Sequence, residues 1–305
     1  MDKILVAGGT GLIGKHLCKK LKAIGYDVSI LSRSRKLINS SSIFYWNPDN
    51  NEIEIESLNN IDYIINLAGA NISSQRWTKK RKIQIIDSRV NSGLVILNAI
   101  KKHEIKIKAY ISASAIGYYG TITTQNIFIE SDAPSVDFLS EVCQKWELTT
   151  DKFNELGIRT VKIRTGIVLA LDGGALNKMT TPIKQNIGSI LGSGNQYMPW
   201  IHLEDLCNIY VLALTDKQFS GAINAVAPMH ISHKDFTLTI ASILNKKIFL
   251  PNTPAFLIKL IFGNRSNLIL NGSRISSNKI IELGYTFKFP KLEGALKNIF
   301  QKALN

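Results

Sequence analysis

The sequence predicts an α/β fold, in which a doubly wound parallel sheet is followed by a small, mainly helical C-terminal cap region. Two observations predict it. Short apolar segments alternate with longer segments of helical periodicity over the first half of the chain, which is typical of parallel strands covered by helices on both faces. The first strand also leads into the first helix through a glycine-rich turn, and such turns commonly hold phosphate groups.

That first turn spaces Gly8, Gly11 and Gly14 as G-x-x-G-x-x-G between an apolar strand over 3–7 and an amphipathic helix over 15–21. The first glycine allows a tight turn, the second lets the backbone approach a diphosphate, and the third lets helix and strand pack closely. Free N–H groups and the dipole of the helix attract the phosphates. We therefore expect a Rossmann-type sheet whose cofactor contacts here are Gly8, Thr10, Gly11, Leu12, Ile13 and Gly14.

The alternation continues along the chain. Apolar strands are expected over 26–31, 63–69, 109–113 and 161–164, and helices over 81–103 and 139–155. Near residue 230 the pattern changes to helical segments that open at His233 and continue over 256–262, 275–283 and 292–302, with a proline-containing break over 250–254. We expect a cofactor-binding domain over 1–230 and a cap over 231–305, which is too small to hold a core of its own and therefore packs on that domain.

Composition narrows the class of protein. The 305 residues are 45% hydrophobic, with no apolar run of membrane-spanning length, and the charged second residue argues against a signal peptide. Three scattered cysteines suit a reducing cytoplasm and show no metal-ligand spacing. The net charge is +14, but the lysines are dispersed and accompany no recognition motif. We expect a cytoplasmic protein with no metal and with neither a nucleic-acid nor a membrane partner, and leave the oligomeric state open.

The end of the second strand indicates which dinucleotide is bound. Sites that prefer NAD place a carboxylate there to accept hydrogen bonds from the ribose. This chain has Ser32, Arg33 and Arg35 instead, and Asp27 is too early, in the turn that enters the strand. A guanidinium and hydroxyl groups suit a 2′-phosphate. We predict NADP(H), with Arg33 as the leading contact and Ser32 and Arg35 assisting; the alternative is that these arginines are merely solvated.

Several segments taken in order resemble the extended and atypical short-chain dehydrogenases/reductases, within them the bacterial NAD-dependent epimerase/dehydratase-like family related to epimerase family protein SDR39U1. The resemblance covers nearly the whole chain and implies a nicotinamide dinucleotide and an epimerase-like oxidoreductase activity. It also implies cofactor contacts from Leu67, Ala68 and Gly69 and from Ser88 and Arg89, although an exposed helix face explains the last two almost as well. The segments that carry it include 8–14, 66–70, 87–90, 112–120, 164–169 and 200–206.

The resemblance further implies a catalytic serine, a tyrosine, and a lysine four residues after the tyrosine whose charge favours tyrosinate. Ser114 matches the serine. No tyrosine of the chain has a lysine four residues on, and alignment on Glu147 puts Leu139 and Cys143 at the places of the tyrosine and the lysine. The standard proton relay is therefore absent from this sequence.

Substitutes are available nearby, each with a structural alternative. Tyr118 and Tyr119 follow Ser114 and could supply a phenol or simply line a pocket. Glu141, Lys145 or His202 could tune or replace that phenol; the first two could also be solvated, and the histidine could be a hydrogen-bonded strand residue. Trp200 and His202 are expected at a substrate pocket, and Asp205 is expected to cap a helix.

Two functions follow from an intact cofactor motif and an incomplete relay. The first is an NADP(H)-binding, epimerase-like oxidoreductase that acts on an unknown small molecule, either a nucleotide sugar or another carbonyl compound, with a non-standard acid–base arrangement around Ser114. The alternative is a non-catalytic NADP(H)-binding sensor or regulatory protein.

Overall fold

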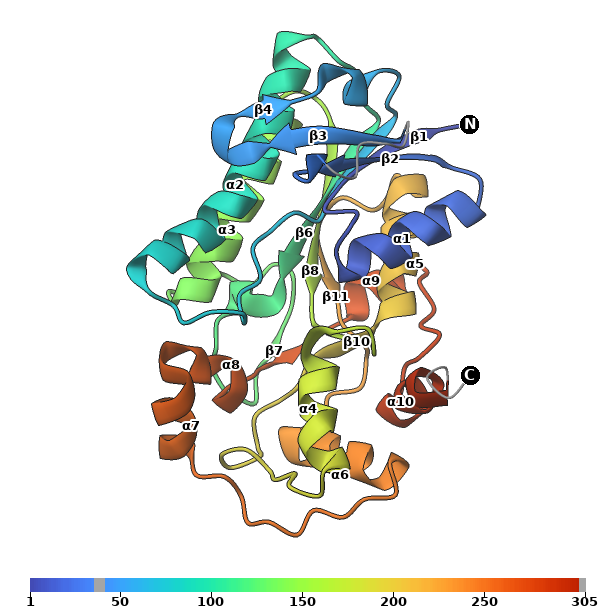
Figure 1. Ribbon diagram of the computed structural model, residues 1–305. Coiled ribbons are helices and arrows are strands. Elements are labelled where there is room, and N and C mark those ends of the chain that lie inside the picture. Colours follow the sequence, from blue (N-terminus) through green and yellow to red (C-terminus); the bar gives the residue numbers. More distant parts are fainter. Residues whose placement is uncertain (36–41, 302–305) are drawn as a thin grey trace. The chain divides into compact units, whose positions relative to one another are not determined.

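The computed structural model describes residues 1–35 and 42–301 (Figure 1). The chain folds as two compact units, each made of three stretches of sequence. The first unit comprises Met1–Tyr118, Ser140–Arg164 and Cys207–Ile223, and the second comprises Tyr119–Leu139, Thr165–Leu206 and the residues from Asn224 onward. Among the described residues, no helix is both long enough and apolar enough to cross a membrane.

An eight-stranded sheet forms the centre of the first unit, with the strand order β11-β8-β6-β5-β1-β2-β3-β4. Strand β1 pairs in parallel with β2 on one side and β5 on the other, so the strand order reverses at β1. Ligands of such sheets bind beyond the carboxyl ends of the strands at this reversal. The strands are β1 (Lys3–Ala7), β2 (Asp27–Ser32), β3 (Ile43–Asn47), β4 (Glu52–Ile53), β5 (Tyr63–Asn66), β6 (Ala109–Ala115), β8 (Arg159–Thr165) and β11 (Gly221–Ala225).

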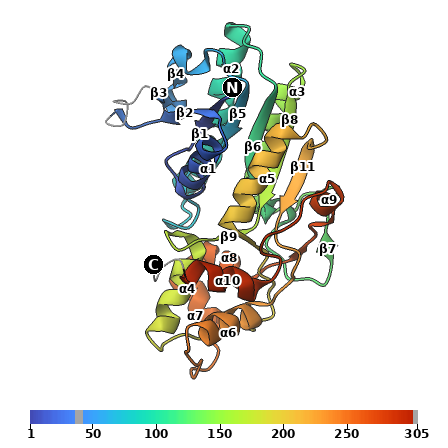
Figure 2. The same ribbon diagram turned by 90° about the vertical axis from the view of Figure 1, so that its right-hand side faces the viewer.

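Helices cover both faces of this sheet, as Figures 1 and 2 show. Helix α1 (Leu12–Ala23) and the part of α5 (Leu203–Thr215) from Cys207 lie on one face, and α2 (Lys79–Lys102) and the part of α3 (Phe138–Asn154) from Ser140 lie on the other. Tyr110 of the sheet stacks on Phe153 of α3 with ring centres 3.7 Å apart. The predicted doubly wound α/β sheet is confirmed.

The second unit is mainly helical, with two short parallel strand pairs. Strand β9 (Ile167–Leu169) pairs with β10 (Trp200–His202), and β7 (Ile127–Phe128) pairs with β12 (Arg274–Ile275). Its hydrophobic core gathers side chains from the strands and from three helices, among them Trp200, Phe236 and Leu296. The helices are α4 (Gly174–Lys184), α6 (His233–Ile243), α7 (Ala255–Phe262), α8 (Asn267–Leu270), α9 (Asn278–Glu282) and α10 (Leu292–Gln301).

Most C-terminal elements agree with the sequence prediction, but the short helix α8 was not predicted and residues 275–277 are not helical. Helix α6 begins at His233 as expected, because the Ser232 hydroxyl accepts the backbone N–H of Asp235 and so caps it. Ile275 was predicted to be helical, and this was wrong: it pairs with Phe128 in β12, and helix α9 begins only at Asn278. The predicted end of the last helix at residue 302 lies outside the described residues.

Candidate functional site

The turn between β1 and α1 requires glycine at two of the three predicted positions. Gly8 has φ +80°, and a Cβ on it would lie 2.9 Å from the carbonyl carbon of Leu67. A Cβ on Gly14 would lie 2.2 Å from the oxygen of Gly8, so helix and turn touch there. At Gly11 the same atom would meet only the Gly8 oxygen, at 3.3 Å, among the described residues. The space above Gly11 therefore remains open to a ligand.

The N-terminus of α1 faces this turn and has the features of an anion-binding site. Gly11 is the capping residue, no side chain caps the helix, and the first turn contains no acidic residue. The first N–H groups of a helix need acceptors, and the helix dipole favours negative charge beside them. Thr10 is exposed in the turn, and Leu12 and Ile13 are half-buried in the first helical turn. The cradle fits the diphosphate of a dinucleotide.

Asn66 fixes the loop that leaves β5 beside the cradle. The side-chain amide of this fully buried residue donates to the hydroxyls of Ser92, at 2.9 Å, and Tyr110, at 2.8 Å. Its oxygen accepts the backbone N–H of Ala68 at 3.0 Å. The predicted contacts Leu67, Ala68 and Gly69 lie on this loop. The sequence showed Asn66 only as part of a family pattern, because its partners lie 26 and 44 residues away.

Ser88 and Arg89 lie on α2 next to the same loop and play different parts. The Ser88 hydroxyl accepts the N–H of Ala70 at 2.9 Å and so braces the loop. Arg89 donates through Nη1 to the carbonyl oxygens of Ile85 and Ala70 at 2.8 and 3.2 Å. A Cβ on Gly69 would lie 3.1 Å from the Arg89 guanidinium carbon, so the glycine makes room for it. Burial lowers the pKa of Arg89 to about 10, which leaves it cationic at neutral pH.

At the end of β2, the described residues 32–35 include no carboxylate. Ser32 is buried, and its hydroxyl accepts the N–H of Ser34 at 3.1 Å. Arg33 is exposed, whereas the Arg35 guanidinium lies 4.0 Å from the ring centre of Tyr45. Asp27, expected in a turn, is the first residue of β2 and pairs with Lys3, at the opposite end of the strand from Arg33.

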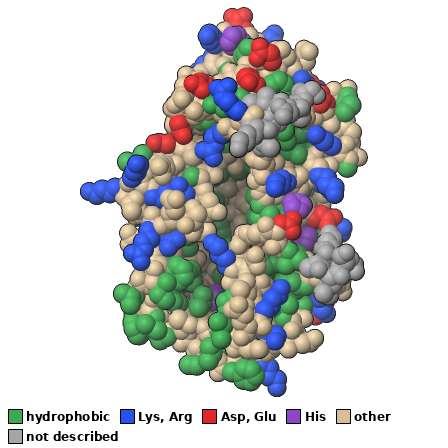
Figure 3. All heavy atoms as spheres, in the orientation of Figure 1, with side chains coloured by type: hydrophobic (Ala, Val, Ile, Leu, Met, Phe, Trp, Pro, Cys, Tyr) green, Lys and Arg blue, Asp and Glu red, His purple; other side chains and the backbone are tan. Residues whose placement is uncertain are grey.

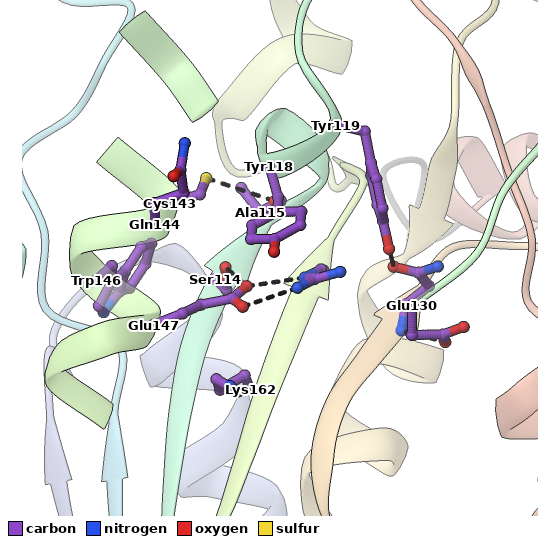
Figure 4. Close-up of polar contacts among 12 residues, drawn as sticks. Ser114, Ala115, Tyr118, Tyr119, Glu130, Cys143, Gln144, Trp146, Glu147 and Lys162 are labelled. Atoms are coloured by element: carbon purple, nitrogen blue, oxygen red, sulfur yellow. Dashed lines mark hydrogen bonds and ion pairs between the residues drawn. The ribbon is translucent and has the colours of Figure 1, made fainter. Parts of the chain in front are cut away.

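A buried polar cluster surrounds Ser114 near the carboxyl end of β6 (Figure 4). The Ser114 hydroxyl donates to Oε1 of Glu147, on α3, at 2.7 Å. Arg164, on β8, donates through Nε to Oε1 and through Nη2 to Oε2 of the same carboxylate, both at 2.8 Å. The three residues are 3%, 5% and 3% exposed. Charged groups are rarely buried so fully unless they are paired, and this pair is bidentate.

The two candidate tyrosines differ in their burial and in the residues that they contact. The half-buried ring of Tyr118 lies against the guanidinium of Arg164, with 3.4 Å between the guanidinium carbon and the ring centre. Tyr119 is fully buried in the second unit, where its hydroxyl donates to Oδ1 of Asn224 at 2.7 Å and its ring stacks on Phe128. The structure therefore brings the ring of Tyr118 to the ion pair beside Ser114, whereas the hydroxyl of Tyr119 is bound to Asn224.

The residue at the expected place of the lysine is Cys143. Its thiol donates to the carbonyl oxygen of Ala115 at 3.5 Å, next to Ser114. Burial raises the pKa of Cys143 to about 12, and the Glu147 carboxylate adds to this rise while the Arg89 guanidinium opposes it. The thiol is therefore neutral at neutral pH and supplies no positive charge. Lys145 and Glu141 pair with each other on the exposed side of α3, at 2.7 Å.

The predicted pocket residues lie in the second unit. Trp200 is fully buried in its core, and Nε1 of Trp200 has no hydrogen-bond partner among the described residues. His202 immediately precedes α5, and its Nδ1 accepts the N–H of Glu204 at 3.0 Å. Its ring packs on Phe289, with ring centres 3.9 Å apart. Their role at a substrate pocket stays a prediction.

The capping role expected of Asp205 was wrong. Asp205 lies in the first turn of α5, but its fully buried carboxylate accepts the Tyr285 hydroxyl at 2.7 Å and the backbone N–H groups of Lys288 and Phe289 at 2.8 and 3.0 Å. Asp205 therefore holds the loop before α10. At the start of α5 it is Nδ1 of His202 that accepts a backbone N–H, that of Glu204. Within the described part of the chain, no group of three or more His, Cys, Asp or Glu could hold a metal ion.

Comparison with known proteins identifies the family. A model of the NAD dependent epimerase/dehydratase family matches residues 4–225. The chain belongs to this family. A second model, a domain of unknown function (DUF1731), matches residues 253–299 of this family member. Epimerase family protein YfhF of Bacillus subtilis (strain 168) is 36% identical over 298 residues, which cover 97% of this chain and 97% of that protein.

Solved structures agree with this assignment of the epimerase-family chain. Human epimerase family protein SDR39U1 with NADPH superposes with a TM-score of 0.87 at 30% identity, covering 98% of this chain and 99% of that one. A nucleoside-diphosphate sugar epimerase of Corynebacterium glutamicum gives a TM-score of 0.80 at 28% identity, covering 97% and 57%. The resemblance to atypical short-chain dehydrogenases related to SDR39U1 is thus confirmed, as is the Rossmann-type sheet.

Proposed function

We propose that this epimerase-family protein is an NADP(H)-dependent oxidoreductase or epimerase that acts on a hydroxyl or carbonyl group of a small molecule, with nucleotide sugars as the first class to test. The observation that carries the proposal is the buried Ser114–Glu147–Arg164 cluster, which lies in the same unit as the uncapped glycine cradle. The names of two relatives support it, since one was solved with NADPH and the other is called a nucleoside-diphosphate sugar epimerase.

The cofactor part of the proposal rests on three groups. The N–H groups at the start of α1 hold the diphosphate above Gly11. Arg33, exposed beyond the end of β2 with no carboxylate among its described neighbours 32–35, pairs with the 2′-phosphate. Leu67, Ala68 and Gly69 line the approach to the ribose next to the nicotinamide. When bound, the dinucleotide supplies or accepts the hydride.

We assign the positive charge beside the nicotinamide ribose to Arg89. Cys143, at the expected place of the lysine, is neutral. The Arg89 guanidinium is close enough to that thiol to lower its pKa, and it approaches from α2 instead of α3. Its guanidinium carbon also lies 4.9 Å from the ring centre of Trp146, three residues along α3 from the thiol. A cation from a neighbouring helix thereby replaces the cation that the usual tyrosine–lysine helix carries.

The geometry of the cluster suggests roles for Ser114 and Tyr118. The proton of the Ser114 hydroxyl is directed to Glu147, so the oxygen of Ser114 is left to accept a hydrogen bond from a substrate hydroxyl. Arg164 holds Glu147 on one side and the ring of Tyr118 on the other. We propose that the Tyr118 hydroxyl exchanges the proton with the substrate oxygen and that Glu147 and Arg164 are positioning residues.

The test is conversion of a panel of nucleotide sugars and simple carbonyl compounds in the presence of NADPH or NADP. NMR spectroscopy follows the products, because an epimerisation consumes no net cofactor. We expect conversion of at least one compound, its loss in Ser114→Ala and Tyr118→Phe, and retention in Tyr119→Phe. Arg89→Lys should retain more conversion than Arg89→Met. A protein that binds NADPH but converts nothing in the panel would contradict the proposal.

The neutral thiol of Cys143 at the expected place of the lysine favours a second candidate, a non-catalytic NADP(H)-binding sensor. This function requires cofactor binding but not the hydroxyl of Ser114. Replacement of the chromosomal gene by a Ser114→Ala version separates the two functions: a sensor leaves the phenotype of the gene intact, whereas an enzyme reproduces the phenotype of the deletion. In a Gly14→Val version the turn at Gly8 cannot form. This version should reproduce the phenotype of the deletion whether the protein is a sensor or an enzyme.

A further inference from the structure

One surface of the second unit is strongly apolar. Of the eight residues of α7, only Ile258 is buried. Phe256 is 67% exposed, Leu260 77% and Ile261 59%. In Figure 3 hydrophobic side chains gather at the lower left, where Figure 1 places this helix. We call the exposed apolar residues of this helix and of the loop before it the α7 patch: Phe249, Leu250, Phe256, Leu257, Leu260, Ile261 and Phe262.

The α7 patch is unusual for a helix of a globular protein. Such helices expose a polar face and turn the apolar face to the core, whereas the sequence of α7 is apolar at every position except Lys259. Single exposed apolar residues are common, but clusters of this kind mark interaction sites. The patch contains no residue of the cofactor cradle or of the cluster around Ser114, so it calls for a separate explanation.

The charge of the segment around the α7 patch indicates the kind of partner that the patch binds. From residue 236 to residue 281 the chain contains no Asp or Glu, but it contains six basic residues. Lys247 and Lys259 are exposed, and Arg265 lies over the ring of Phe262 at the end of α7. The segment therefore combines exposed aromatic and aliphatic side chains with six positively charged residues and no negatively charged residue of its own. The six basic residues are Lys246, Lys247, Lys259, Arg265, Arg274 and Lys279.

We propose that the α7 patch docks on the surface of a membrane that contains anionic lipids. Helices that lie in the membrane interface carry bulky apolar residues together with Lys and Arg, and anionic headgroups attract those cations. An α-helix of this length reaches only about 12 Å, far less than the roughly 30 Å of a bilayer core, so α7 lies on the membrane and does not cross it. This proposal departs from the sequence expectation of no membrane partner.

A second copy of the chain fits the α7 patch less well. In a symmetric dimer formed by this helix, Lys259 and Arg265 of both copies would meet at one interface. The segment offers no acidic residue to pair with them, and each copy carries a net charge of +14. Repulsion between like charges therefore disfavours this contact, whereas a bilayer with anionic headgroups neutralises the same cations.

The test is sedimentation of the full-length protein with phosphatidylcholine vesicles, with and without phosphatidylglycerol. We expect binding only to the anionic vesicles and its loss at about 1 M salt, where the screening length falls to about 3 Å. Leu260→Glu should weaken this binding by about tenfold or more, because a leucine side chain no longer enters the interface. The matched control is Leu148→Glu on α3, where the leucine is 62% exposed, and it should bind as the unchanged protein does.

Charge is tested in the same assay by Lys259→Glu, with Lys101→Glu at the exposed end of α2 as its control. Thermal unfolding of each variant confirms that it folds. Failure to bind anionic vesicles, or equal loss in Leu148→Glu and Leu260→Glu, overturns the proposal. A concentration-dependent dimer that Leu260→Glu abolishes, without vesicle binding, overturns it in favour of a second copy. No residue proposed to bind NADPH lies on α7, so the outcome of the vesicle assay does not rest on the proposed function.

Discussion

Arg164 is a cation with almost no contact with solvent, and its environment explains why it is retained in a strand. Both oxygens of Glu147 accept its N–H groups, and the ring of Tyr118 covers its face. Glu147 and Arg164 are both buried, so water cannot take the place of either member of the ion pair. The residue pair thus fixes the orientation of Ser114, whose hydroxyl completes the environment of the carboxylate.

Arg164→Met should destabilise the protein by about 3–5 kcal/mol, because it leaves the carboxylate of Glu147 buried without its cation. Chemical denaturation at neutral pH measures this. The double variant Arg164→Met with Glu147→Leu removes both charges and should recover much of the loss. A cost of less than about 1 kcal/mol in the single variant, as for an exposed ion pair, would contradict the buried geometry.

A substitution of the single residue Arg33 tests whether the protein prefers NADPH to NADH. Arg33→Asp should weaken NADPH binding by about tenfold or more, since a charge-assisted hydrogen bond to the 2′-phosphate is lost, and should leave NADH binding the same or tighter. Fluorescence titration with both dinucleotides measures this, with Arg76→Asp at another exposed arginine as the control. The NADP(H) assignment fails if the unchanged protein binds NADH as tightly as NADPH.

Helix α6 shows how an element can carry pH sensitivity. Its first residue, His233, is buried under the cap formed by Ser232, and burial lowers the pKa of this histidine from 6.5 to about 4. In the unfolded chain the histidine titrates near 6.5. Between these two values the unfolded state binds a proton that the folded state does not, so stability falls as the pH falls through this window.

We therefore expect the free energy of unfolding to decrease by about 3 kcal/mol between pH 6.5 and pH 4 from this residue, on top of the general acid effect. His233→Gln should remove that part of the slope. The exposed His103 provides the matched control, since His103→Gln should leave the slope unchanged. Denaturation curves at a series of pH values supply the comparison; parallel slopes for His233→Gln and the unchanged protein would rule out the effect.

At the scale of the whole molecule, most local elements followed from the sequence and most long-range contacts did not. The strand over 3–7 and the helix that opens at His233 were predicted because neighbouring residues determine them. Ile275 was misassigned because its strand depends on Phe128, far away in the chain. The pairing of Ser114 with Glu147 spans 33 residues, and the sequence showed Glu147 only as a position of the family pattern.

Cofactor binding should be visible in the stability of the whole molecule. NADPH at about 100 times its dissociation constant should add about 2.7 kcal/mol to the free energy of unfolding, which raises the Tm by several degrees. Gly11→Val should abolish the increase and change the Tm of the free protein little, because φ at Gly11 is −76° and an added Cβ would meet only the Gly8 oxygen, at 3.3 Å. Gly294→Val on α10, where nothing lies within 4 Å of an added Cβ, controls for the added side chain, and an undiminished shift in Gly11→Val would place the cofactor elsewhere.

The carboxylate of Asp205 has a practical consequence for how this chain can be divided. It joins α5 to the segment 285–289 through three hydrogen bonds, and Asp205 falls within the region of the epimerase family model while its partners fall within that of the second model. A C-terminal truncation at residue 252 would strand a buried negative charge. The two matched regions therefore depend on each other at this carboxylate, and exchange of C-terminal segments between relatives should succeed only when the acceptor and its three donors are exchanged together.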